Sequence, residues 1–186
     1  MERLTLPCAG SLKWYSGLAE SILSGKEFAA ADTGCMLNRY AIRGNNGEKL
    51  LLSVPVEGGR KNLLRLPPGA DIPLSEHGGW RRVHRGAICA AYGRSPYFQH
   101  YFPMMEQIII RSRTLKDLSG NFHSLVMRSA FQPDVLESVK KMRCDRAELF
   151  KAEHTRCLAE TDTGLSIIDS LFRIGPDTIF AAIKPL

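Results

Sequence analysis

The strongest constraint on the fold is a turn flanked by two strand-like runs. Residues 37–43 and 49–56 are rich in apolar side chains, and Gly44-Asn45-Asn46-Gly47 separates them. Asn and Gly tolerate the positive φ angles of tight hairpin turns, so the pattern predicts a β-hairpin. The second run is almost continuously apolar, which predicts a strand inside a sheet covered on both faces. Pro55 lacks a backbone N–H, so strand pairing should end or bulge there.

The segment before the hairpin has the pattern of a helix. Apolar side chains recur at helical spacing over residues 11–23, where Ser11 can cap the N-terminus and Gly25 can end the helix. Short alternating runs predict three further strands. These are residues 2–7, residues 27–32 and residues 62–66.

The next part of the chain predicts two amphipathic helices. Between Glu76 and Gly93, apolar residues from Trp80 to Tyr92 form one stripe at helical spacing. Ser95-Pro96 has the pattern of a new helix start, with serine as the cap and proline at the first helical position. Pro103 predicts a break or kink in that second helix.

The remaining sequence predicts further helices. Thr114 to Asp117 resembles a capping box, and the apolar stripe of the helix that follows runs from Leu115 to Val126. Residues 133–161 are weakly patterned and are expected to hold one or two short helices and a loop. Two short helices are expected to close the chain. They are residues 165–174, ended by Gly175-Pro176, and residues 177–183.

Strands come first, with one early helix between them, and helices follow. This order predicts an α/β or α+β fold with a small N-terminal sheet and a helical C-terminal half. The 186 residues suit a single domain over residues 1–186. No apolar run approaches the roughly 18 residues of a transmembrane helix, and the N-terminus lacks the pattern of a secretory signal. The expected location is therefore the cytoplasm.

Charge and cysteine content narrow the expected ligands. The five cysteines are widely spaced and form no CxxC pair, and no glycine-rich phosphate loop or HExxH pattern occurs, so neither a metal nor a cofactor is expected. The formal net charge of +6 favours anionic ligands. The densest basic groups lack interleaved aromatic residues, which predicts no nucleic-acid binding and leaves a nucleotide sugar or another phosphorylated small molecule. These groups are Arg81, Arg82 and Arg85, and Lys140, Lys141 and Arg143.

His84 is the most notable titratable residue, because it lies on the apolar stripe between Trp80 and Ile88. A partly buried histidine can act as an acid or base near neutral pH. It can equally be a histidine at the edge of the core whose ring is satisfied by a backbone carbonyl. Asn38 and Arg39 point to opposite faces of a strand, where they could orient a sugar hydroxyl and bind a phosphate, or form a polar pair at a sheet edge.

A second group of candidates lies near the C-terminus. Ser166, Asp169 and Arg173 share one side of a predicted helix. Asp169 could act as a base or orient His84, or it could simply pair with Arg173 at i, i+4. A triad of Ser166, His84 and Asp169 is disfavoured, since serine nucleophiles usually sit on a sharp turn.

Tyr92 and Tyr97 belong to a cluster of aromatic residues around Ser95-Pro96. Such rings can stack on a sugar or a base. They also commonly form a packed corner between two helices, and the sequence leaves both roles open.

Four segments together resemble the WbqC-like protein family between about Asn38 and Pro176. They are Asn38–Ile42 with the later Leu52–Val56, Trp80 with His84 and Ala91-Tyr92, Ser95–Phe98 running into Tyr101, and Leu165–Asp169 with Leu171-Phe172 and Gly175-Pro176. Members of the family usually begin with a strand leading into a Tyr-Phe-Pro or Gln-Pro segment. Residues 6–11 lack this aromatic pair.

The resemblance implies a role in bacterial surface-polysaccharide (O-antigen-type) biosynthesis. One hypothesis is a transferase that acts on an activated or lipid-linked sugar, with His84 as the acid or base and Asp169 as its partner. Its substrate contacts would be Asn38, Arg39, Tyr92, Tyr97 and Ser166, converging on one pocket. The alternative is a non-catalytic binding or scaffold member of a glycan-assembly complex with protein partners. That alternative predicts dispersed or mutually buried candidates and a large apolar surface patch.

Overall fold

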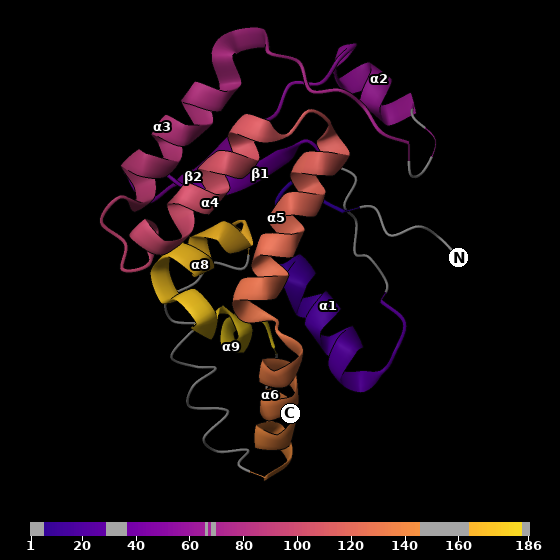
Figure 1. Cartoon of the computed structure of the whole chain (residues 1–186), viewed down its shortest axis with the longest axis vertical. Helices are drawn as coiled ribbons and strands as arrows, with labels where there is room; N and C mark the ends of the chain where they lie inside the picture. Colours follow the sequence, from indigo (N-terminus) through magenta and orange to yellow (C-terminus); the bar gives the residue numbers. More distant parts are fainter. Residues whose placement is uncertain (1–5, 29–36, 66, 68–69, 146–163, 184–186) are drawn as a thin grey trace.

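The computed structural model describes residues 6–28, 37–65, 67, 70–145 and 164–183. Strands β1 (Arg39–Arg43) and β2 (Lys49–Ser53) form an antiparallel pair in which Ala41 lies opposite Leu51, which confirms the predicted hairpin (Figure 1). Gly47 takes a φ of 82° in the turn, a conformation that favours glycine. β2 ends before Pro55, as predicted.

The prediction that β2 lies inside a sheet covered on both faces is wrong. The side chains of Leu50 and Leu51 are 41% and 50% exposed, and Leu52 is the buried residue of the strand. Within the described part of the chain the sheet has only these two strands, so β2 is an edge strand. An apolar run alone does not reveal how many neighbours a strand has.

The predicted strand over residues 62–66 is also wrong. Residues Gly59–Arg65 form helix α2, and Leu63 is its buried residue. Gly58 and Gly59, with φ of 71° and 68°, turn the chain into this helix. A five-residue run is too short for its periodicity to separate a strand from a helical turn.

Helix α1 (Leu12–Ser24) follows the predicted bounds closely. The Ser11 hydroxyl accepts a hydrogen bond from the Trp14 N–H, and Gly25 ends the helix with a φ of 67°. The predicted strands at residues 2–7 and 27–32 fall largely outside the described residues, and residues 6, 7, 27 and 28 form no strand.

Helix α3 (Trp80–Tyr92) follows a short 3₁₀ turn, η1 (His77–Gly79), and buries Trp80, His84, Ile88 and Tyr92, as its stripe predicted. The next helix, α4, covers Phe98–Arg111 and so begins after the predicted Ser95-Pro96 start. Ser95 instead lies in a turn, where its N–H donates to the Tyr92 carbonyl.

A break or kink was predicted at Pro103, and the break does not occur, because α4 continues through this residue. Proline removes one backbone hydrogen bond, the one that would reach the carbonyl of Gln99. Both residues are exposed, so solvent can reach that carbonyl.

Helix α5 (Leu115–Ala130) starts where the capping pattern predicted, with the Thr114 hydroxyl accepting from the Asp117 N–H. The predicted helices at residues 133–174 are found in part, while residues 146–163 lie outside the described chain. The remaining elements are α6 (Pro133–Asp145), α8 (Ile167–Ile174), the 3₁₀ turn η2 (Gly175–Asp177) and α9 (Thr178–Ala182).

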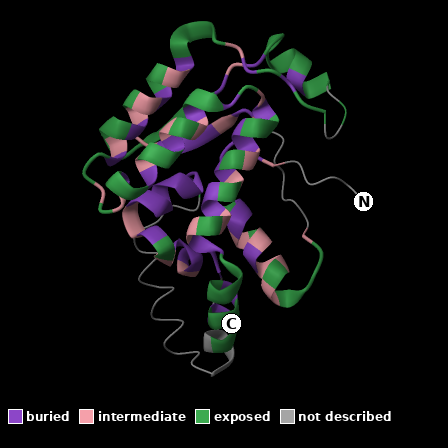
Figure 2. Cartoon of the chain, viewed as in Figure 1, coloured by how far each residue is buried: buried purple, intermediate pink, exposed green. Residues whose placement is uncertain are grey.

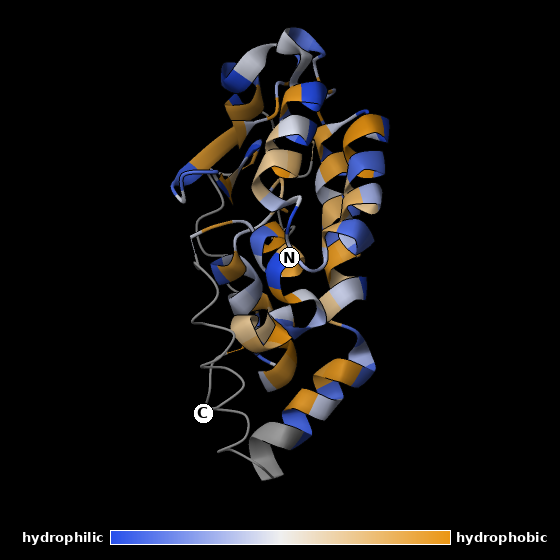
Figure 3. Ribbon diagram, turned by 90° about the vertical axis from the view of Figure 1, so that its left-hand side faces the viewer, coloured by the Kyte–Doolittle hydropathy of each residue, from blue (hydrophilic) through white to orange (hydrophobic). Residues whose placement is uncertain are grey.

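These elements pack around one apolar core that includes side chains from the hairpin, α1, α3, α4, α5, α8 and α9. Buried residues gather where the helices face one another and β1 (Figure 2). Figure 3 shows apolar and polar residues interspersed along the helices, as is typical of amphipathic helices. The mixed fold, with a small early hairpin and a mostly helical remainder, confirms the predicted class.

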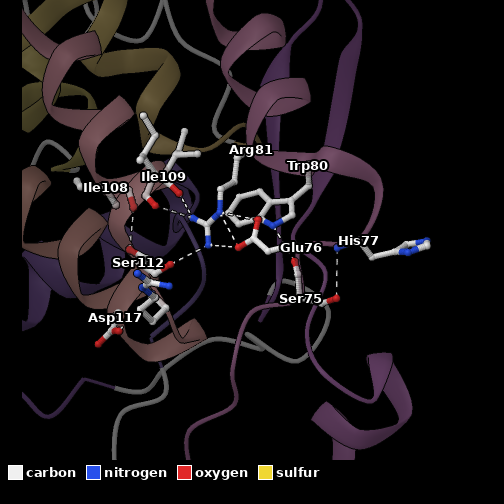
Figure 4. A network of polar contacts seen from close by, with 11 residues as sticks. Ser75, Glu76, His77, Trp80, Arg81, Ile108, Ile109, Ser112 and Asp117 are labelled. Carbon is white, nitrogen blue, oxygen red and sulfur yellow. Dashed lines mark hydrogen bonds and ion pairs between the residues drawn. The ribbon is translucent and has the colours of Figure 1, made fainter.

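A polar network around Arg81 joins the start of α3 to the end of α4 (Figure 4). The Arg81 guanidinium donates to the carbonyls of Ile109 and Ser112, and its Nε and Nη2 contact the Glu76 carboxylate at 2.9 and 2.7 Å. The hydrogen bond from Arg81 lowers the pKa of Glu76. The guanidinium thus caps α4, whose last carbonyls lack helical partners.

Candidate functional site

The His84 ring is enclosed on the face of α3 that packs against the hairpin. Its Nε2 lies 3.2 Å from the Ser53 carbonyl and its Nδ1 lies 2.9 Å from the Tyr40 hydroxyl. A carbonyl can only accept, so Nε2 carries the proton and Nδ1 accepts from Tyr40. Burial lowers the pKa of His84 to about 4. The ring is therefore neutral at physiological pH, and both of its nitrogens have partners.

Asp169 lies on α8, a helix that contacts both β1 and α3. Its side chain is 1% exposed. Its Oδ1 accepts from the Arg43 Nε at 3.3 Å and from the Tyr92 hydroxyl at 3.0 Å. Its Oδ2 lies 3.9 Å from the Arg173 guanidinium, which is the i, i+4 pair that the sequence allowed.

Tyr92 links three elements through its hydroxyl. The Tyr92 hydroxyl oxygen accepts a hydrogen bond from the backbone N–H of Arg43 at 2.9 Å, and the hydroxyl donates a hydrogen bond to the Asp169 carboxylate. Burial, followed by the negative charge of Asp169, raises the pKa of Tyr92. The contact ties the end of β1 to α3 and α8.

Asn38 and Ser166 hold the backbone of the hairpin. The Asn38 side-chain amide donates to the Val54 carbonyl at 2.8 Å, which closes the open end of the strand pair. Ser166 caps α8 by accepting from the Ile168 N–H. Its own N–H donates to the Ala41 carbonyl at 2.8 Å, so the start of α8 is bonded to the free edge of β1.

Arg39 and Tyr97 take no part in the contacts around Asp169. The Arg39 Nε is buried and has no hydrogen-bond partner among the described residues. The Tyr97 N–H donates to the Phe172 carbonyl, and its ring lies against Gly175, where an added Cβ would come within 2.5 Å of it. Tyr97 therefore forms part of a packed corner between α4 and α8, which was one of its two expected roles.

The structure brings together only some of the candidate residues. Tyr92 and Asp169 meet, but the bonded partners of His84 are Tyr40 and Ser53, so the predicted pair of His84 and Asp169 is not formed. Sequence reasoning missed Arg43. The available signal was its position at the end of the strand. Arg43 comes four residues after Arg39, and side chains at even spacing along a strand share one face.

Arg43, Asp169 and Arg173 form a charged cluster at the surface. The carboxylate is buried, whereas the side chains of Arg43 and Arg173 are 34% and 30% exposed. Two positive charges against one negative charge leave the cluster with a formal charge of +1. The partly exposed guanidinium groups are the side chains of this cluster that an anion could contact.

A separate shallow hollow of about 470 Å³ lies between the hairpin turn and α3, lined by Leu50, Ala87 and Ala90 among others. Leu50 pairs with Ile42, so its side chain points away from the face that carries Arg43. No candidate residue lines this hollow.

The described residues bring no three His, Cys, Asp or Glu side chains close enough to hold a metal ion. Of the cysteines, Cys8 is a buried free thiol and Cys89 an exposed one. Among the helices that the structure describes, none has both the length and the apolar character needed to cross a bilayer.

The two basic groups named from the sequence do not join into one basic face in the described part of the chain. Arg81 is held by Glu76, and Arg85 forms an ion pair with Glu106. Lys140 and Lys141 lie on α6, at the opposite end of the molecule from the start of α3 (Figure 1).

Together the fold and the polar contacts define a mixed α/β protein built around a short hairpin that two helices anchor. The sequence model of the WbqC-like protein family matches residues 30–131, more than half of the chain, and the protein belongs to this family. No curated protein and no solved structure matches the chain.

Proposed function

We propose that the protein acts in bacterial surface-polysaccharide biosynthesis and binds an activated, phosphate-bearing sugar at the Arg43–Asp169–Arg173 cluster. Membership of the WbqC-like family supports the process. The observation that carries the ligand class is the pair of partly exposed guanidinium groups around one buried carboxylate.

The cluster is suited to hold a phosphate because its arginines are already oriented. Asp169 engages Arg43 through Nε, and the Tyr92 hydroxyl fixes the same carboxylate oxygen. Ordering a long side chain on binding opposes affinity, so an arginine that is held before binding loses less entropy. A guanidinium offers a planar fork of donors that matches the oxygens of a phosphate.

A transferase is the second candidate, and one observation favours it. The Asp169 Oδ2 is buried beside Arg173 and has no hydrogen-bond partner among the described residues, so it has a lone pair for a sugar hydroxyl that enters between Arg43 and Arg173. In this proposal Asp169 is the general base, while Arg43 and Arg173 hold the phosphates. The proposal gives His84 no role in proton transfer, because both of its ring nitrogens are bonded within the core.

The binding role can be tested by thermal unfolding with UDP-glucose, UDP-N-acetylglucosamine and UDP alone. A ligand that binds only the folded state at 100 times its Kd adds about 2.7 kcal/mol to the free energy of unfolding. We expect a rise in Tm for the wild type that is lost in Arg43→Gln and Arg173→Gln. Arg85→Gln is the matched control, because it removes a paired arginine elsewhere on the surface.

A shift that survives in both cluster variants would refute this binding site. The transferase role has its own test, in which the UDP-sugar that binds is mixed with free hexoses as acceptors. A hexose hydroxyl, deprotonated by Asp169, would form the new bond to the anomeric carbon as the bond to the UDP phosphate breaks, and the released UDP is measured. Release by the wild type that stops in Asp169→Asn, while the Tm shift persists, would support the transferase. Binding without release would support a non-catalytic binding protein.

A further inference from the structure

Helix α2 carries an unusual surface for so short an element. It contains Arg60, Lys61 and Arg65, all exposed, and no acidic residue. Beside them, Leu64 is 59% exposed, the highest value among the exposed large hydrophobic residues of the described chain. The helix lies at the periphery of the molecule and is mostly exposed (Figures 1 and 2).

The cations and the leucine occupy the side of α2 that faces away from the core. Leu63 is the buried residue of the helix. With about 100° between successive residues, Lys61 and Arg65 project opposite Leu63, and Leu64 lies next to them. The outer side therefore presents an apolar side chain flanked by positive charges.

This arrangement does not help the helix to fold. Like charges at i, i+4 repel each other, as Lys61 and Arg65 do here. A helix of seven residues has little stability of its own. The exposed side chain of Leu64 also contributes no hydrophobic free energy to folding, because it stays in water. The three features fit a surface that meets an anionic and partly apolar partner.

We propose that α2 docks on a bilayer surface containing anionic lipids. Lys61 and Arg65 contact the phosphates of the lipid headgroups, and Leu64 enters the boundary between headgroups and acyl chains. Nucleic acid is the weaker match, because residues 57–75 contain no aromatic side chain that could stack on a base. This proposal does not depend on the sugar-binding cluster.

The test is co-sedimentation of the full chain with vesicles. One set is pure phosphatidylcholine, and the other contains about one third phosphatidylglycerol, whose charge attracts cations near the surface. We expect binding to the anionic set alone. Each cation near such a surface strengthens partitioning about fivefold, so Lys61→Gln with Arg65→Gln should weaken it about 25-fold.

Two further variants separate the parts of the proposal. Leu64→Gln should weaken binding while leaving its dependence on salt unchanged, because it alters no charge. Lys140→Gln with Lys141→Gln makes the same charge change on exposed positions of α6 and should leave binding within about twofold of the wild type. All of these positions are exposed, so unchanged thermal unfolding is expected and serves as the check on folding.

Three results would overturn the proposal. The first is equal binding to both sets of vesicles, or to neither. The second is an equal loss of binding in the α6 control, which would indicate a response to net charge alone. The third is binding to a DNA duplex that the α2 variants abolish, without any binding to vesicles.

Discussion

Replacing His84 by Gln should remove a pH dependence from the stability of the protein. Glutamine can still donate to the Ser53 carbonyl, the bond that the His84 Nε2 makes, but it cannot take up a proton. Burial lowers the pKa of His84 from its ordinary value of 6.5 to about 4. The unfolded chain therefore binds a proton at a higher pH than the folded chain does, and stability falls as the pH drops through this window.

The magnitude follows from the two pKa values. Above pH 7 the histidine is neutral in both states, and its full contribution to stability is present. At pH 5 the unfolded chain is almost fully protonated while the folded chain is not, which lowers the free energy of unfolding by about 2 kcal/mol. The loss levels off at about 3 kcal/mol below pH 4.

Urea denaturation of the wild type and His84→Gln at pH 8 and pH 5 measures this directly. The difference in unfolding free energy between the two proteins should shift by about 2 kcal/mol, with the wild type losing more at pH 5. Burial also lowers the pKa of His123, but this histidine is present in both proteins and its effect cancels. A difference that stays constant from pH 8 to pH 5 would show that His84 titrates normally. It would then remain available as an acid or base near neutral pH.

Three further predictions concern stability, each measured by urea or thermal unfolding. Asp169→Ala should cost about 2 to 3 kcal/mol, because Arg43 and the Tyr92 hydroxyl lose a buried partner; an effect under about 0.5 kcal/mol would contradict the contacts described. Arg81→Ala should cost about 1 to 2 kcal/mol by leaving the end of α4 uncapped, with Arg82→Ala as a neutral control. Gly175→Ala should cost more than about 2 kcal/mol, since its φ of 57° and ψ of −130° disfavour any side chain; a neutral result would refute that backbone conformation.

The parts of the fold that local sequence determines were predicted well. Ser11, Thr114 and Gly25 mark helix ends as expected, because a cap acts through hydrogen bonds and dihedral angles within a few residues. The stripe of α3 was predicted correctly at Trp80, His84, Ile88 and Tyr92, since its period reports one buried side. It was wrong at Val83, at the edge of the stripe, which is 53% exposed.

The errors arose where the outcome depends on distant parts of the chain. Exposure of Leu50 and Leu51 follows from the number of strands in the sheet, which no local pattern contains. The helix at Gly59–Arg65 depends on the turn at Gly58 and on the packing of Leu63 in the core. Short segments are decided by such contacts more than by their own preference.

The candidate site shows the same division. The placement of His84 on an apolar stripe was correct, since this histidine is buried. The burial of Asp169 was not predicted. Sequence could not determine their partners, because each bonds to residues far along the chain. Tyr40 lies 44 positions from His84, and Arg43 lies 126 positions from Asp169.

The hairpin explains why these polar residues are buried. An isolated pair of five-residue strands is marginally stable in water, so this hairpin needs support from its neighbours. His84 bonds to Tyr40 of β1 and to the Ser53 carbonyl of β2 from α3, whereas Asp169 bonds to Arg43 of β1 from α8. One histidine and one carboxylate thereby fix the hairpin between two helices. Both ring nitrogens of His84 are bonded to the hairpin, so the prediction about stability rests on this histidine. Asp169 also contacts two partly exposed arginines, so the anion-binding proposal rests on Asp169.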